Sequence, residues 1–294
     1  MKNGRFWEVD QVEAGKKRLP AFLFLLAMPM AAGYAALAET MRLAFDKDAF
    51  TYIPLVWMLC AAFFYLRWQQ VRKLARFSVA GGVPFLVLAA SIALAAQFLS
   101  GFLSKDIFLS VQMAAIVVWW AGSFVLCFGA KAARAALFPL VFLFASVPLP
   151  STVLVWIVSQ LQIWSALSAM ALYRVFGVAA FRDGVYLTLP GLTIEVAKEC
   201  SSIRSSTMLL VTAIGISQML LRSRWRRLIV ILVAIPLSVI KNGVRIFTIT
   251  MLSIDVDPSY MTGKLHHQGG VVFFAAALFI LFLLLWWLRR GEST

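Results

Sequence analysis

The sequence predicts an all-α polytopic membrane protein. Of its 294 residues, 62% are hydrophobic and only 14% are charged, and the mean hydropathy is +0.88. A water-soluble chain of this length cannot cover so much apolar surface, so a lipid bilayer is the expected solvent. Aromatic residues also gather at the ends of apolar runs, as is typical of membrane interfaces; examples are Trp7, Tyr52, Trp68, Trp225, Trp286 and Trp287.

The net charge of +14 indicates membrane topology and not nucleic-acid binding. Lys and Arg are concentrated in short connections between apolar runs, and they form no extended basic domain. Because basic residues prefer cytoplasmic loops, we expect five segments to lie in the cytoplasm: the N-terminus, 67–76, 131–134, 222–227 and the C-terminal tail.

Apolar runs of about twenty residues, the length that crosses a bilayer, cover 19–40, 51–67, 79–99, 107–130, 135–150, 152–176, 202–221, 228–253 and 268–288. If every run crossed, the termini would lie on opposite sides of the membrane and the basic cluster 222–227 would lie outside. One run should therefore not cross. Polar residues interrupt 152–176 at helical spacing, which would give one wet face, so we expect an interfacial or re-entrant helix there. About eight transmembrane helices remain, with both termini inside.

The outer connection after this helix has a different pattern. Residues 178–199 alternate apolar and polar residues between Gly and Pro, which predicts a short extracytoplasmic hairpin. No internal repeat or linker divides the chain, so we expect one integral membrane domain over 1–294. Within it, 1–130 supplies the first four spans, and 131–294 contains the polar residues that could perform chemistry.

Three reactive residues share one membrane depth in this topology. Cys200 opens the span 202–221 at its outer end, where a helix N-terminus favours a thiolate. Arg245 follows Arg227 by about 27 Å along the next span, at about 1.5 Å per residue, and so also lies near the outer interface. His266 opens the last span from the outer side.

This combination is suited to acyl transfer at a peptide bond. A thiolate can attack the carbonyl carbon, an imidazole can serve as general base and acid, and a guanidinium can stabilise the tetrahedral oxyanion. Cys60 and Cys127 lie inside apolar runs and are interpreted as packing residues. Because the chain has no HExxH or CxxC motif and only the histidines His266 and His267, we expect neither a metal nor another cofactor.

Neighbouring polar residues could support the site. Arg204 lies one turn after Cys200 and could favour the thiolate or bind substrate. Lys241 and Asn242 lie in the same span as Arg245, where Lys241 could also form a structural pair with a carboxylate or carbonyl. The alternative function is a transporter or carrier in which Arg245, Lys241 and the histidine pair line a substrate path.

Three segments of the C-terminal half resemble the exosortase/archaeosortase family of membrane transpeptidases. They are ECSSIRSS at 199–206, NGVRIF at 242–247 and HHQGGVVFF at 266–274, in the family's order, and LFPLVFLFASVPLP at 137–150 adds weaker support. The resemblance implies that Cys200 is the nucleophile, that Arg245 is the arginine of the N-x-x-R segment and that His266 is the third catalytic residue.

Two details qualify this resemblance. The family pattern resembles H-x-x-x-G-x-x-x-F, which His266, Gly270 and Phe274 satisfy, whereas a frame that starts at His267 loses the glycine. The family often has C-S-G where this chain has Ser202 in the third position, a difference that concerns substrate fit more than chemistry.

The resemblance implies a sorting enzyme of the cell inner membrane with its active site on the periplasmic side. Its partner would be the C-terminal sorting signal of an exported protein, made of a short motif such as PEP, a transmembrane helix and a basic tail. The enzyme would cleave near the motif, hold the product as a thioester on Cys200, and transfer it to an acceptor nucleophile or to water. Membrane lipids would surround the enzyme, nucleic acid would have no role, and surface anchoring alongside exopolysaccharide production would be the outcome.

Overall fold

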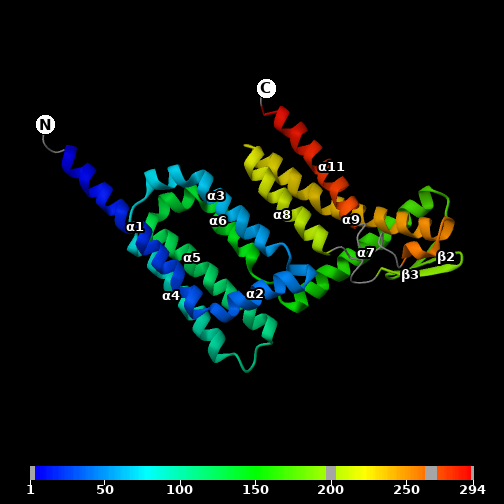
Figure 1. Ribbon diagram of the computed structural model, residues 1–294, viewed down its shortest axis with the longest axis horizontal. Helices are drawn as coiled ribbons and strands as arrows, with labels where there is room; N and C mark the ends of the chain where they lie inside the picture. The colour runs from blue at the N-terminus through cyan, green and yellow to red at the C-terminus, as the bar shows by residue number, and fades with distance from the viewer. Residues whose placement is uncertain (1–3, 197–202, 262–269, 293–294) are drawn as a thin grey trace. The chain divides into compact units, whose positions relative to one another are not determined.

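The chain is a multi-pass membrane protein built almost entirely of helices (Figure 1). The computed structural model describes residues 4–196, 203–261 and 270–292. In these ranges seven helices are long and apolar enough to cross a bilayer, and the pair α1 and α2, bent by 78°, would make an eighth if it forms one span. The residues group into two compact units, Met1–Ser151 and Thr152–Thr294.

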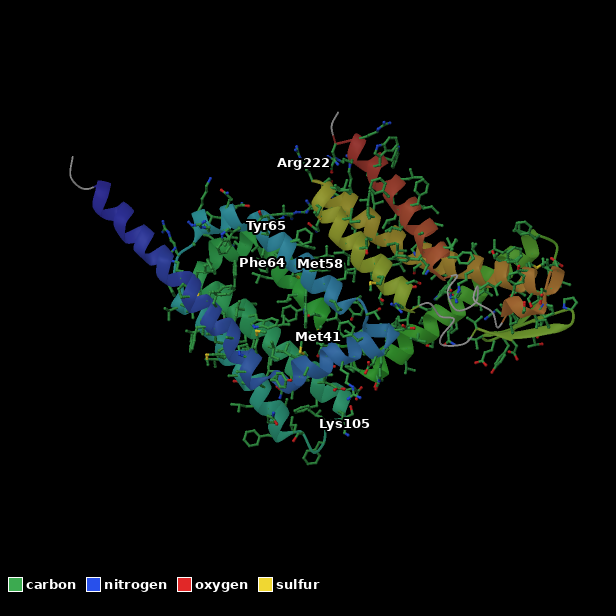
Figure 2. All side chains as sticks on the ribbon, in the orientation of Figure 1. Met41, Met58, Phe64, Tyr65, Lys105 and Arg222 are labelled. Carbon is green, nitrogen blue, oxygen red and sulfur yellow. The ribbon has the colours of Figure 1, made fainter. Side chains whose placement is uncertain are left out.

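The first unit contains the N-terminal helices. They are α1 (Gly4–Ala32), α2 (Tyr34–Asp46), η1 (Asp48–Phe50), α3 (Ile53–Leu74), α4 (Val79–Phe98), α5 (Lys105–Ala135), α6 (Leu137–Phe142) and η2 (Leu143–Ser146). Large apolar side chains point outward from these helices, as Met58 and Tyr65 do on α3 (Figure 2), and Tyr65 is 81% exposed. Such a surface is suited to lipid and not to water.

Glycines let α4 and α5 approach closely. A Cβ at Gly82 would lie 2.4 Å from the Leu126 Cβ, and one at Gly122 would lie 2.7 Å from the Phe85 Cβ. Small residues at such crossings allow the close backbone packing on which helix association in a membrane depends. Gly129 kinks the same helix with φ +83°, and a Cβ there would lie 2.5 Å from the Arg76 carbonyl oxygen.

The segment 135–150, expected as a regular span, is only partly helical. Its two short helices, α6 and η2, together cover Leu137–Ser146, and Pro148 and Pro150 prevent further helix because proline lacks an N–H and forces extended backbone before it. The segment nevertheless returns along α5. Arg67 on α3 donates to the Ala135 carbonyl at one end, and Ser110 near the start of α5 donates to the Pro148 carbonyl at the other.

The second unit contains the C-terminal helices and a small sheet. Its elements are α7 (Ser151–Val175), β1 (Phe181–Asp183), β2 (Tyr186–Leu189), β3 (Leu192–Glu195), α8 (Ile203–Leu220), α9 (Arg224–Asp255), η4 (Pro258–Met261) and α11 (Gly270–Arg290). Helices α8, α9 and α11 pack around one apolar core (Figure 1), which contains Leu209, Ala213, Leu221, Val230, Ala234, Ala277, Leu281 and Leu285.

Where a short hairpin was expected within 178–199, the chain forms a three-stranded antiparallel sheet in the order β1-β2-β3. Gly184 and Gly191 sit in the two tight turns with φ +58° and +78°, a conformation that glycine adopts without steric cost. One face of the sheet packs through Leu187 and Ile194 on α7 and α9.

Two polar residues of helix α7 face protein and not water, in contrast to the expectation from the sequence. Gln162 and Ser165 are buried and hydrogen-bonded to protein groups, so the wet face expected for 152–176 is wrong at these positions. The helix is also long and apolar enough to cross a bilayer. Its interfacial placement stays a prediction.

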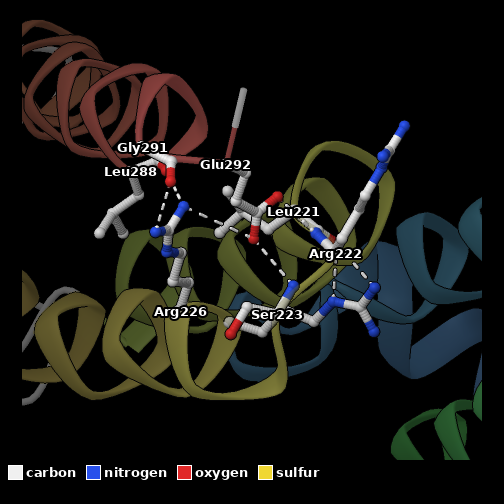
Figure 3. Close-up of polar contacts among 8 residues, drawn as sticks. Leu221, Arg222, Ser223, Arg226, Leu288, Gly291 and Glu292 are labelled. Atoms are coloured by element: carbon white, nitrogen blue, oxygen red, sulfur yellow. Dashed lines mark hydrogen bonds and ion pairs between the residues drawn. The ribbon is translucent and has the colours of Figure 1, made fainter. Parts of the chain in front are cut away.

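The C-terminal tail after α11 is hydrogen-bonded to the turn between α8 and α9 (Figure 3). The Glu292 carboxylate accepts hydrogen bonds from the backbone N–H groups of Arg222 and Ser223, each at 2.8 Å. These hydrogen bonds hold the pKa of Glu292 below its ordinary value. Arg226 donates to the carbonyls of Leu288 and Gly291 at 2.8 and 2.7 Å. The basic 222–227 cluster is therefore partly neutralised and tied to the end of α11.

Candidate active site

One face of α9 carries two cations, Lys241 and Arg245, one helical turn apart. Lys241 is only 6% exposed, and its ammonium donates a hydrogen bond to the Ser205 hydroxyl in the first turn of α8. Like charges at this spacing repel each other, and an ionisable group inside a membrane helix usually marks a functional site. Lys241 therefore lies beside the start of α8, which begins three residues after Cys200.

Arg245 also lies beside the start of α11. A Cβ built on Gly270, the first residue of that helix, would be 4.0 Å from the guanidinium carbon Cζ of Arg245. Gly270 follows His266 by four residues. The single helix α9 thus brings its two cations next to the chain segments that adjoin the predicted cysteine and the predicted histidine.

The residues between the two cations fix α9 against α7. Asn242 is 1% exposed, and its Nδ2 donates to the Ser165 Oγ at 2.9 Å. At Gly243 a Cβ would lie 2.3 Å from the Ser168 Oγ, so only glycine permits this crossing. Asn242 and Gly243 therefore hold α9 against α7.

A second contact with α7 fixes Val196, which precedes Cys200 by four residues. The Gln162 side chain donates from Nε2 to the Val196 carbonyl at 2.7 Å, and the Val196 N–H donates to the Val185 carbonyl at 3.0 Å. Val196 is thereby held on one side of segment 197–202, and Ile203 begins α8 on the other.

Three of the predicted site residues, Cys200, His266 and His267, lie outside the described residues. Arg204 lies in the first turn of α8 and is exposed, and its carbonyl accepts a hydrogen bond from Thr207. The structure thus places Arg245, Lys241 and Asn242 on one helix, with Arg204 on its neighbour α8.

Cys60 and Cys127 are buried, and the Cys60 thiol contacts the Pro139 carbonyl at 3.5 Å. Within residues 4–196, 203–261 and 270–292, no group of three or more His, Cys, Asp or Glu side chains could hold a metal ion.

Sequence reasoning missed the polar residues of α7 and α8 that support the site. Gln162, Ser165 and Ser168 recur at a spacing of three, a pattern that places them on one helix face. The same spacing is compatible with a face that meets water and with a face that meets polar groups inside the protein, and the structure shows the second. Ser205, the partner of Lys241, lies inside the ECSSIRSS segment, where nothing in the residue pattern distinguishes it from the neighbouring serines.

A comparison with known protein families found a match that includes this part of the chain. The family model described as Transmembrane exosortase (Exosortase_EpsH) matches residues 44–283. The match includes all of the residues discussed above for the site. No curated protein and no solved structure matches the chain.

Proposed function

Because the chain belongs to the transmembrane exosortase family, we propose that it is a membrane cysteine transpeptidase that cleaves a C-terminal sorting signal of exported proteins. The family consists of membrane proteases or transpeptidases that act on protein sorting signals. The finer proposal concerns the thioacyl mechanism, the residues that perform it and the side of the membrane on which it occurs.

The observation that carries the proposal is the position of Arg245. Its guanidinium lies 4.0 Å from a Cβ built at the start of α11, and Lys241, one turn away, is bonded to the first turn of α8. The Cys200 and His266 segments adjoin these two helix starts. A guanidinium that lies beside these helix starts is suited to stabilising an oxyanion.

In the first step, the Cys200 thiolate attacks the carbonyl carbon of the scissile peptide. Negative charge develops on the carbonyl oxygen, where Arg245 would stabilise it. The C–N bond then breaks, and the protonated His266 gives its proton to the leaving amine. The product is a thioester on Cys200, with the rest of the signal released.

In the second step, an acceptor nucleophile or water gives its proton to His266 and attacks the thioester. The carbon–sulfur bond breaks, and Cys200 is restored as a thiolate. His266 is proposed for this role in preference to His267 because of its spacing to Gly270 and Phe274. Arg204 and Lys241 would add positive charge that favours the thiolate.

The proposed setting is the cell inner membrane, with both termini in the cytoplasm and the site on the periplasmic side. The proposed substrate signal consists of a short motif such as PEP, a transmembrane helix and a basic tail, and the proposed outcome is surface anchoring alongside exopolysaccharide production. All residues proposed for catalysis belong to the compact unit Thr152–Thr294, inside the catalytic half 131–294.

The test is a cleavage assay in cells that express an exported reporter with a PEP motif, an apolar helix and a basic tail. Cys200→Ala should leave the reporter uncut in the membrane, with cleavage reduced at least 1,000-fold, on the order of the loss seen when other enzymes lose a nucleophile. Cys127→Ala, at a buried packing position, is the matched control and should retain cleavage. Normal cleavage by Cys200→Ala would contradict the proposal.

A further inference from the structure

Among residues 4–196, 203–261 and 270–292, strand β3 has a neighbouring strand on one side only. In the order β1-β2-β3 it pairs with β2, with Leu187 opposite Ile194 and Leu189 opposite Leu192. The hydrogen bond from the Val196 N–H to the Val185 carbonyl extends the same register. In an antiparallel ladder, alternate residues direct their N–H and C=O groups to the partner strand. The residues between them, Thr193 and Glu195, therefore direct theirs to the open edge.

These edge groups have no backbone partner in the part of the chain that the structure describes. Unpaired strand edges are templates for another extended chain. The opposite edge of the sheet offers less, because only Arg182 of the three residues in β1 lies between hydrogen-bonded pairs. The Arg182 side chain also turns back to the Gly184 carbonyl at 2.7 Å. The β3 edge is thus the longer of the two available edges.

The β3 edge lies near a residue proposed for catalysis. The inner face of the sheet packs through Ile194 and Val196 on Tyr173 of α7 and on Ile246 of α9. Ile246 directly follows Arg245, so the edge is fixed relative to the proposed oxyanion-stabilising residue. Glu195, the last residue of β3, is followed five residues later by Cys200. A chain paired with β3 would therefore pair with the strand that directly precedes, in sequence, the segment of the proposed nucleophile.

We propose that the open edge of β3 binds an extended segment of the substrate polypeptide as a fourth strand, next to its scissile bond. This inference rests on the proposed function and adds a mode of substrate positioning. Thr193 and Glu195 offer two N–H donors and two C=O acceptors, which pair with backbone groups common to all peptides. Substrate side chains would then alternate between the two faces of the extended sheet. An extended backbone also exposes its carbonyl carbons, as nucleophilic attack requires.

Proline substitutions test the edge directly, because proline removes an outward N–H and is tolerated at edge positions that face away from the partner strand. Thr193→Pro and Glu195→Pro should each raise the apparent KM for the PEP reporter about fivefold or more, the effect of one net hydrogen bond. Arg182→Pro, with its outward N–H on the opposite edge, is the matched control and should leave KM unchanged. The alanine variants at the same three positions separate the loss of a side chain from the loss of an N–H.

Equal KM values for Thr193→Pro, Glu195→Pro and wild type would overturn the proposal, as would an equal loss in Arg182→Pro. In each variant, alkylation of Cys200 reports that its thiol is accessible, and protection of the buried Cys60 and Cys127 from the same reagent reports that the protein is folded. An unchanged KM in the proline variants is distinct from failure of the proposed function, which would appear as continued cleavage by Cys200→Ala.

A second measurement remains decisive if a proline variant does not accumulate. A photo-crosslinking amino acid is placed at Thr193 or at Arg182 in the Cys200→Ala background, where the reporter remains uncut. Crosslinks to the reporter from position 193 and not from position 182 are expected. Crosslinks that yield only a dimer of the enzyme, or equal crosslinking from both positions, would show that the edge does not bind substrate.

Discussion

Gly243→Ala tests the crossing of α7 and α9, which holds the NGVRIF segment in place. The added Cβ would lie 2.3 Å from the Ser168 Oγ and 2.5 Å from its Cβ, whereas ordinary contacts begin at 3.4 Å. Rotating the Ser168 side chain cannot relieve this overlap of about 1 Å, because rotation leaves its Cβ in place and the backbone N of Ala169 is also only 3.0 Å away. Overpacking of this kind costs about 2 kcal/mol.

The assay is thermal unfolding in detergent, combined with cleavage of the reporter. For a chain of this size, about 2 kcal/mol corresponds to a fall in Tm of roughly 4–8 °C. Cleavage should fall as well, because the displaced α9 carries Arg245. Ser168→Gly removes two of the three clashing atoms, so the double variant should recover about 1 kcal/mol relative to the sum of the single changes.

A Gly243→Ala variant with wild-type Tm and activity would refute the crossing. An additive double variant would also count against it, since independent effects mean that the two residues do not touch. The matched control is Gly101→Ala, because a Cβ at Gly101 would meet no atom within 4 Å.

Three further predictions concern charge and access. Lys241→Met should lower kcat for reporter cleavage about tenfold, and Lys241→Arg should restore part of the loss. Wild-type kcat in both variants would show that Lys241 does not belong to the site. Glu292→Gln should destabilise the protein by about 1 kcal/mol at neutral pH. The pKa of Glu292 is lowered in the folded protein, so its carboxylate adds stability above the ordinary carboxyl pKa, and this stability is lost as the pH falls through the folded pKa. The difference in Tm between Glu292→Gln and wild type should therefore disappear in acid. A difference that does not change with pH would contradict a stabilising role for the carboxylate at the α8–α9 turn. A membrane-impermeant maleimide applied from outside should label Cys200 but not the buried Cys60 and Cys127, and equal labelling of all three would contradict the proposed topology.

The helical fold could be predicted from the sequence because the bilayer imposes a simple rule on length and hydrophobicity. The rule did not predict the backbone of 135–150, where the composition is typical of a span but Pro148 and Pro150 end the helix. Hydropathy measures whether a segment prefers lipid, whereas its backbone form depends on local hydrogen bonding. The segment still returns along α5, with its carbonyls bound by Arg67 and Ser110.

The supporting part of the site was harder to predict. Helical spacing placed Gln162 and Ser165 on one face, but it did not reveal that this face meets Val196 and Asn242 and not water. Those partners lie 34 and 77 residues away along the chain. Arg245 could be singled out because a charge within an apolar run is rare. Polar residues that form ordinary internal hydrogen bonds lack such a signal.

The most direct test of the central claim is mass spectrometry of the enzyme quenched in acid during cleavage of the reporter. A covalent adduct with the mass of the cleaved reporter fragment is expected, attached to the peptide that contains Cys200 and removed by hydroxylamine, as a thioester is. The adduct should be absent in Cys200→Ala and formed much more slowly in Arg245→Ala. Cleavage that proceeds without an adduct, or with an adduct on another residue, would contradict the account.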